Sequence, residues 1–200
     1  MPKFIGIKRL WYCDPLKAKP TQDTISAVLN GEDTALLVNL SEVKNVHQDT
    51  WGYQQGDPSV TDYKNELTGQ TYFRDKEDAG DKTINFTMGE YDYQHKADLQ
   101  GGEVIKENKT ISGETVEVVV GWKAPTTLKI VEKAIIGLTK TNTFVVFTNA
   151  SLVAKGDQQQ KAIGLGIVAT AQENPNTYTE NNKSVQISDE YWFDNGVEEA

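Results

Sequence analysis

The chain has 200 residues and a formal net charge of −9, from 29 acidic and 20 basic side chains. This length suits a single domain over residues 1–200 that buries its core without disulfides or metals. The single cysteine, Cys13, excludes an internal disulfide framework, and we expect it to be buried. The acidic balance argues against ordinary DNA binding, which depends on phosphate neutralisation by Lys and Arg.

The N-terminal apolar run is interrupted by Lys3, Lys8 and Arg9. A signal peptide needs an unbroken apolar core of roughly 7–15 residues, so none is expected here. No stretch reaches the roughly 18 consecutive apolar residues of a membrane helix. We therefore expect a soluble protein made in a cytoplasm.

The first predicted elements are a strand over Phe4–Tyr12 and a short helix that ends at Asn30-Gly31. Thr21 or Asp23 can cap this helix, and apolar residues recur at helical spacing within it. Val43–Trp51 is predicted to form a further strand.

Residues Gly52–Asp81 form a long polar stretch rich in Gly, Asp and Thr. Loops longer than roughly 12–15 residues are usually functional or disordered. The aromatic side chains of Tyr53, Tyr63, Tyr72 and Phe73 argue against disorder. We predict an extended arm or a β-excursion.

The segment Gly80–Gly102 predicts a strand, a short capped helix and a glycine stop. In Lys82–Met88 the apolar side chains alternate with polar ones, as in a strand with one buried face. Asp92 can accept hydrogen bonds from the free N–H groups that open the helix, and Gly101 or Gly102 can end it. A helix of about two turns must pack on a sheet to be stable.

Strand signals dominate the C-terminal half. Val116–Trp122 alternates cleanly, whereas Thr127–Thr139 fits either a helix or a strand. The turn residues after it and the β-branched Thr143–Thr148 favour a strand and a hairpin. Ser151–Lys155 is predicted as another short strand, and Val185–Phe193 as the last strand.

Lys161–Ala171 is predicted as a strand with Gly164 and Gly166 on one face. Glycines inside a strand usually mark a bulge or a close approach by other backbone. We favour a helix that packs tightly on this face, and a subunit contact is the alternative.

Residue types that carry catalysis or bind metals are sparse. His47 and His95 are the two histidines, and neither lies in a His-x-x-x-His, Cys-x-x-Cys or facial carboxylate pattern. Gly164–Gly166 lies inside a strand and so does not fit a phosphate-binding loop. Carboxylates of glycosidase type could still meet in space from distant positions. We expect no enzyme activity, no metal and no cofactor.

Four tryptophans allow a rival interpretation, and they are Trp11, Trp51, Trp122 and Trp192. Exposed aromatic rings on a β-sandwich can stack on sugars, so a carbohydrate-binding or adhesin-type module is conceivable. The alternative is that each ring fills a core or an interface, which is usual for large amphipathic rings.

The strand, capped helix and double glycine of Gly80–Gly102 (GDKTINFTMGEYDYQHKADLQGG) resemble the major tail (tube) proteins of bacteriophages. The neighbouring stretches Ser59–Arg74 and Lys133–Ser151 are similar to the same family. The predicted strands and short helices together indicate an α+β, mainly antiparallel β fold. The expected form is a tail-tube-like sandwich or flattened barrel with one or two short packed helices.

The resemblance also implies a structural virion protein rather than an enzyme. Six copies would form a ring, and stacked rings would form a tail tube, with tape measure, terminator and baseplate proteins as partners. The tube would be a passive conduit through which DNA passes without specific binding. The protein would be made in the bacterial host cytoplasm and reside in the virion tail, away from membranes.

Two acidic blocks bear on this function. Residues 49–107 carry 6 basic and 13 acidic groups, and the C-terminal residues 173–200 carry 1 and 7. We expect a polar arm at about 52–81 and an acidic C-terminal segment over 172–200. The candidate assembly or lumen residues are Asp57, Asp62, Tyr63, Tyr72, Asp75 and Asp81.

Overall fold

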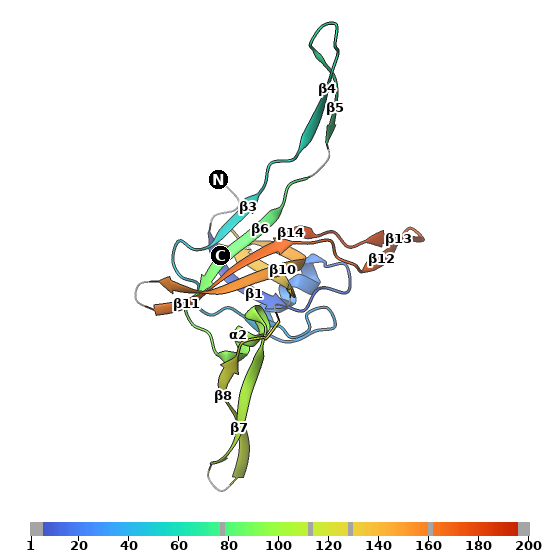
Figure 1. Ribbon diagram of the computed structural model, residues 1–200. Helices are drawn as coiled ribbons and strands as arrows, with labels where there is room; N and C mark the ends of the chain where they lie inside the picture. Colours follow the sequence, from blue (N-terminus) through green and yellow to red (C-terminus); the bar gives the residue numbers. More distant parts are fainter. Residues whose placement is uncertain (1–5, 77–78, 112–113, 128–129, 160–161, 196–200) are drawn as a thin grey trace.

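The computed structural model describes residues 6–76, 79–111, 114–127, 130–159 and 162–195, and these form a central sheet from which hairpins project (Figure 1). Every strand pairing in these ranges is antiparallel. The helical elements are short: α1 (Gln22–Ser26), the 3-10 turn η1 (Ala27–Asn30) and α2 (Tyr93–Gln100). The expected α+β, mainly antiparallel β fold is therefore confirmed.

Within the described ranges the central sheet has eight strands, in the order β2-β1-β9-β10-β11-β6-β3, with β14 also paired to β10. The bounds are β1 (Ile7–Cys13), β2 (Ser41–Glu42), β3 (Gly52–Gln55), β6 (Lys82–Met88), β9 (Val131–Thr139), β10 (Thr143–Gln159), β11 (Ala162–Ala171) and β14 (Glu190–Asp194). No backbone pairing among these described strands joins β3 to β2. The sheet is therefore open, and the expected flattened barrel does not close.

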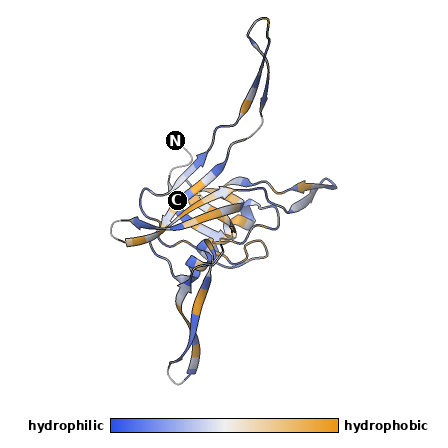
Figure 2. Cartoon of the chain, viewed as in Figure 1, coloured by the Kyte–Doolittle hydropathy of each residue, from blue (hydrophilic) through white to orange (hydrophobic). Residues whose placement is uncertain are grey.

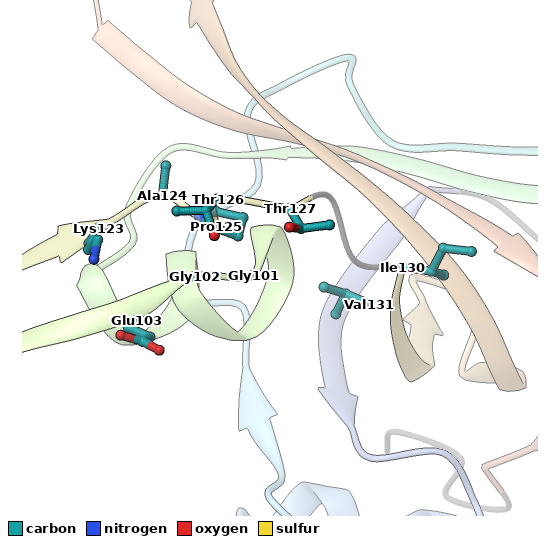
Figure 3. A pocket seen from close by; sticks show the side chains of 10 residues that line it. All are labelled: Gly101, Gly102, Glu103, Lys123, Ala124, Pro125, Thr126, Thr127, Ile130 and Val131. Atoms are coloured by element: carbon teal, nitrogen blue, oxygen red, sulfur yellow. The ribbon is translucent and has the colours of Figure 1, made fainter.

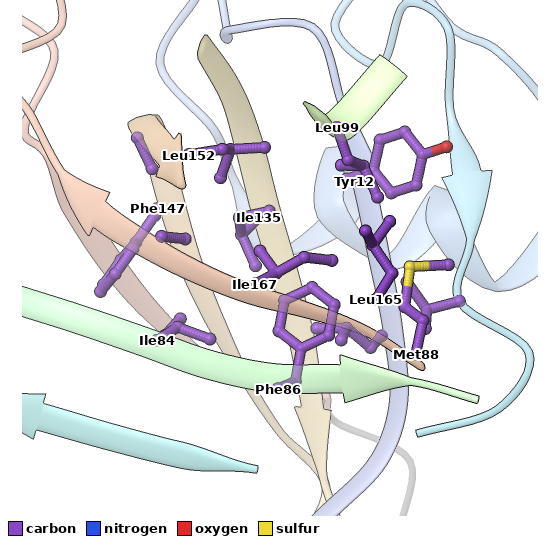
Figure 4. Close-up of a cluster of buried hydrophobic side chains, with 14 of the residues drawn as sticks. Tyr12, Ile84, Phe86, Met88, Leu99, Ile135, Phe147, Leu152, Leu165 and Ile167 are labelled. Carbon is purple, nitrogen blue, oxygen red and sulfur yellow. The ribbon is translucent and has the colours of Figure 1, made fainter. Parts of the chain in front are cut away.

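Both faces of the central strands are buried, because successive side chains alternate between two hydrophobic clusters in the described chain. In β1, Leu10 and Tyr12 join the first cluster, while Trp11 and Cys13 join the second. Figure 4 shows the first cluster, where side chains from β1, β6, β9, β10 and β11 converge with one from α2. The second cluster lies between the sheet and the α1–η1 segment.

The α1–η1 segment follows the predicted capping pattern. Thr21 caps α1 by accepting a hydrogen bond from the backbone N–H of Thr24, and Gly31 ends η1 at a φ of 70°. Ile25 and Val28 point into the second cluster and are fully buried. The predicted helix and both of its ends are confirmed.

The helix α2 is held at both ends as predicted. Asp92 accepts a hydrogen bond from the backbone N–H of His95 at 2.8 Å, and Gly101 ends the helix at a φ of 77°. Leu99 is fully buried in the first cluster, so α2 is anchored to the sheet by an apolar contact. The preceding strand, β6, has the predicted bounds Lys82–Met88.

The longest strand, β10, joins segments that were predicted separately. Thr143–Thr148 and Ser151–Lys155 both lie within it, and the register to β9 shifts between Phe147 and Ala150. Before this irregularity β10 pairs with β14, and after it β10 pairs with β11. A shift in register, rather than a loop, therefore separates the two predicted segments.

Side chains, rather than backbone bonds, link β3 and β6 to β14. The ring of Tyr53 meets that of Trp192 edge-on at 5.5 Å between centroids. Lys82 Nζ donates to Asp189 at 2.9 Å and lies 3.1 Å from Glu190. Burial alone would lower the pKa of Lys82, but hydrogen bonds and charges from these two carboxylates raise it overall. Lys82 therefore remains charged and joins β6 to the start of β14.

Two strand predictions were wrong. Val43–Trp51 contains an isolated bridge from Val46 to Met88 rather than a strand, and the local strand is β2. Val185–Phe193 is divided between β13 (Lys183–Gln186) and β14, which belong to different sheets. Buried Ile187 lies at the break and donates its N–H to the carbonyl of Asn176. Period-two alternation cannot show where a chain changes partners.

The preferred explanation of the β11 glycines was also wrong. A Cβ on Gly164 would lie 2.6 Å from Cγ2 of Thr87, and one on Gly166 would lie 3.2 Å from Cβ of Asp157. These neighbours belong to β6 and β10, so adjacent strands of the same sheet, and not a helix, require the glycines. The alternative of a subunit contact stays a prediction.

Candidate assembly surface

Within the described ranges three hairpins form two-stranded sheets of their own, and we call them the β4–β5 arm, the β7–β8 arm and the β12–β13 arm. Their strands are β4 (Val60–Lys64), β5 (Thr71–Lys76), β7 (Glu103–Ile111), β8 (Glu114–Lys123), β12 (Thr177–Glu180) and β13 (Lys183–Gln186). The β4–β5 and β7–β8 arms project in opposite directions (Figure 1). An isolated two-stranded hairpin is marginally stable in water and has open edges, so the arms are the candidate surface for contacts with other chains.

The β4–β5 arm has one aromatic face. Tyr63 pairs with Phe73 across the strands with ring centroids 5.6 Å apart, and the two residues are 43% and 54% exposed. The other face carries an ion pair in which Arg74 donates to the two carboxylate oxygens of Asp62 at 2.5 and 3.0 Å. The hydrogen bond from Arg74 lowers the pKa of Asp62. Aromatic rings gain much from burial, so the Tyr63–Phe73 face is suited to a contact.

The predicted assembly residues lie along this arm and at its base: Asp62 and Tyr63 in β4, Tyr72 and Asp75 in β5, and Asp57 and Asp81 near the body. The base is narrow, because Gly56 donates its N–H to the carbonyl of Asp81 at 2.7 Å. A Cβ on Gly80, which has a φ of 74°, would collide with the carbonyl of Gly56. The predicted β-excursion is therefore present, whereas the assignment of these residues to a lumen or seam stays a prediction.

The β7–β8 arm was only half predicted, because Val116–Trp122 signals β8 but the polar sequence of β7 does not alternate clearly. Ile105 and Val116 lie on one face and are 45% and 43% exposed, with Val118 between them in the cross-strand register. On the other face Lys106 donates to Glu117 at 2.9 Å. Figure 2 shows hydrophobic segments along this arm as well as in the central sheet.

The β12–β13 arm is fixed to the body by two asparagines that the sequence did not reveal, of which one is buried and the other half-buried. Asn174 is fully buried, and its Nδ2 donates to the carbonyls of Leu16 at 2.9 Å and Thr148 at 3.4 Å. Asn176 donates its backbone N–H to Asn174 Oδ1 and accepts from the N–H of Ile187. A buried amide that is fully hydrogen-bonded fixes the position of the segments it joins. The acidic C-terminal segment is thus partly integrated into the body.

A hydrogen-bonded Ser–His–Asp chain lies at the start of α2. Ser41 Oγ is 3.3 Å from His95 Nε2, and His95 Nδ1 is 2.7 Å from Asp92 Oδ1. In nucleophilic catalysis the carboxylate is secluded and the nucleophile faces a substrate site. The side chain of Asp92 is 66% exposed and already accepts the backbone N–H of His95. We interpret this arrangement as a helix cap that ties α2 to β2.

A cleft of about 380 Å³ lies where the β7–β8 arm meets α2 (Figure 3). Gly101, Gly102 and Pro125 line it together with Lys123 and Glu103. Among the lining residues that the structure describes, the titratable side chains are Lys123 and Glu103. In the ranges that the structure describes, no group of three or more His, Cys, Asp or Glu side chains could hold a metal ion.

Cys13 and three of the four tryptophans are used in packing, whereas Trp192 is 38% exposed. Cys13 is buried as predicted, and burial raises the pKa of its thiol to about 12. Trp11 is fully buried, and Trp51 packs against the first cluster. Trp122 donates to the carbonyl of Gly101 at 3.0 Å. The carbohydrate-binding alternative stays a prediction.

No protein-family model matches the chain, and a search of curated proteins finds no match either. Neither α-helix in the described ranges has the length and apolarity that a membrane-spanning helix requires.

Proposed function

We propose that this chain is a structural subunit of a phage tail tube, which assembles into hexameric rings that stack into a hollow conduit for DNA. The proposal rests on the resemblance of Gly80–Gly102, Ser59–Arg74 and Lys133–Ser151 to major tail proteins. It is supported by an open antiparallel sheet with short packed helices.

The observation that carries the proposal is the set of hairpin arms with exposed apolar side chains. An exposed aromatic pair and a valine-rich strand on free-standing hairpins mark surfaces for protein contacts. A catalytic or ligand-binding protein would instead have a well-formed, mostly apolar pocket with a few convergent polar groups. Self-assembly uses such arms directly, because each copy can cover the apolar faces of its neighbours.

The partners follow from the same proposal. Neighbouring copies are the main partner, and tape measure, terminator and baseplate proteins bind the ends of the tube. Duplex DNA passes through without specific binding, since a net charge of −9 offers few phosphate-neutralising contacts. The subunit itself carries out no reaction and resides in the virion tail.

Light scattering at rising concentration followed by negative-stain microscopy tests the proposal. Rings or tubes are expected, either spontaneously or after addition of the tail-initiation complex, and duplex DNA added to them should stay unbound at physiological salt. The matched variant replaces residues 58–79 with an Asn-Gly turn, which keeps β3 in the sheet and should give a folded monomer. A wild-type chain that stays monomeric with the initiation complex would refute the proposal.

A further inference from the structure

The β7–β8 arm leaves the body at the end of α2, around the side chain of Trp122. Gly101 and Gly102 separate α2 from β7, and Figure 3 shows both glycines where the helix ends. Trp122 lies in β8 opposite Val104 of β7 and is half-buried. We call this group the Trp122 junction, and it consists of Lys96, Gly101, Gly102 and Trp122.

Two contacts fix the indole ring of Trp122 to α2 and its end. Its Nε1 donates to the carbonyl of Gly101 at 3.0 Å, and Nζ of Lys96 lies 4.0 Å from the centre of the ring. The hydrogen bond holds the edge of the indole, and the cation–π contact holds its face, so the ring keeps one orientation. Because Trp122 belongs to β8, these contacts attach the base of the arm to the helix.

The two glycines make this close approach possible. Gly101 and Gly102 have φ values of 77° and 96°, in the left-handed region that favours glycine. A Cβ on Gly102 would collide with the carbonyl of Lys123 and would lie 2.9 Å from Nε1 of Trp122. The double glycine therefore both ends α2 and makes room for the end of β8 beside it.

The helix α2 is itself fixed to the central sheet. Leu99 is buried in the first cluster, and the hydroxyl of Tyr12 in β1 donates to Asp98 at 3.2 Å. Ser41 Oγ in β2 lies 3.3 Å from His95 Nε2. The helix thus contacts the sheet and the arm at the same time. A change in the direction of the arm would break contacts on one of these two sides.

We propose that α2 and the Trp122 junction hold the β7–β8 arm in one direction before any other chain binds. A hairpin that moved freely on the body would lose conformational entropy whenever its surface was bound. An arm that is already fixed avoids this cost, so its exposed side chains can form a tighter contact. The inference concerns the single chain and goes beyond the proposed function, so each can fail without the other.

The distance between two spin labels on the full-length chain, measured by pulsed electron paramagnetic resonance, tests this inference. One label is attached at Thr110→Cys, near the far end of β7, and the other at Val153→Cys, which is exposed on β10. Cys13 should stay unlabelled, because it is buried and its thiol has a pKa raised to about 12. Dilution with unlabelled protein restricts the measured distances to one chain. A single narrow distance distribution is expected.

Trp122→Ala in the doubly labelled chain should replace the narrow distribution by a broad one. Lys96→Ala keeps the indole and its hydrogen bond, so it should broaden the distribution less, and it provides the test if Trp122→Ala does not fold. Lys106→Ala is the matched control, because it removes an ion pair to Glu117 within the arm and should leave the distribution narrow. Circular dichroism establishes that each variant is folded.

Two results would overturn the inference. One is a broad distribution in the labelled chain that keeps Trp122 and Lys96, which would show an arm free to move. The other is a distribution that stays equally narrow in the folded Trp122 and Lys96 variants, which would show that the junction does not fix the arm. Neither result depends on whether the chain forms rings or tubes.

Discussion

Replacing Asn174 with alanine is expected to destabilise the protein by about 2 kcal/mol, because the four hydrogen bonds of its side chain are lost and the backbone N–H of Asn176 loses its acceptor, which by itself costs roughly 1–3 kcal/mol. Asn174 is fully buried and joins three segments: the chain after β1, the middle of β10 and the base of the β12–β13 arm. Its Oδ1 accepts the backbone N–H of Asn176 at 3.0 Å.

The size of this destabilisation depends on which hydrogen bonds the neighbouring backbone groups keep in the variant. The carbonyl of Leu16 still accepts from Asn176 Nδ2 at 3.3 Å, and that of Thr148 still accepts from the N–H of Leu16 at 2.9 Å. The N–H of Asn176 loses its acceptor, which is the costly part of the change. For a chain of 200 residues, about 2 kcal/mol corresponds to a fall in Tm of roughly 4–8 °C.

Urea and thermal denaturation followed by circular dichroism measure this effect on the monomeric chain. Thr179→Ala is the matched control, because Thr179 is exposed on β12 of the same arm and its loss should change the free energy of unfolding by less than about 0.5 kcal/mol. If Asn174→Ala were as stable as Thr179→Ala, the asparagine would not fix the arm to the body.

Two further predictions concern packing and pH. Gly164→Ala should lower the free energy of unfolding by about 1–3 kcal/mol, because the added Cβ would crowd Thr87. Gly156→Ala is the control and should be nearly neutral, since its added Cβ would meet only a side-chain atom at 3.9 Å. Equal stabilities of the two variants in urea denaturation would contradict this explanation. Burial opposes ionisation of Asp14, but hydrogen bonds from Lys133 and Asn39 prevail and lower its pKa in the folded state. A lowered folded-state pKa gives stability that is present above about pH 4 and lost as the pH falls further. Asp14→Asn should therefore reduce the stability of the protein at pH 7, and its stability should fall less steeply than that of the wild-type chain as the pH decreases from 5 to about 2. If Tm depended on pH in the same way in both proteins, ionised Asp14 would not stabilise the fold.

Elements whose signals are local could be predicted from the sequence. The alternation of β6 and the cap residues Thr21 and Asp92 act through neighbouring backbone groups, so their effect does not depend on distant partners. The β4–β5 arm was predicted for a related reason, since a long polar stretch with scattered aromatics cannot join a core along its whole length.

The candidate surface could be predicted only in part. Tyr63 and Tyr72 were singled out, but their partners were not, because the pairing of Tyr63 with Phe73 depends on the register of the hairpin and the bulge beside it. The β7 strand was missed, since charged residues at Lys106, Glu107 and Lys109 hide its alternation. A free-standing hairpin exposes both faces and so lacks the apolar–polar contrast that reveals a strand.

The sequence by itself determined the mainly antiparallel β class, the capped helices, the burial of Cys13 and the excursion after residue 52, because each follows from local periodicity, caps or composition. Only the tertiary structure decided that Val185–Phe193 divides between two sheets, that the β11 glycines make room for Thr87 and Asp157, and that Asn174 fixes the last arm. These features join residues far apart in the chain, and local side-chain patterns carry no information about which distant segments will meet.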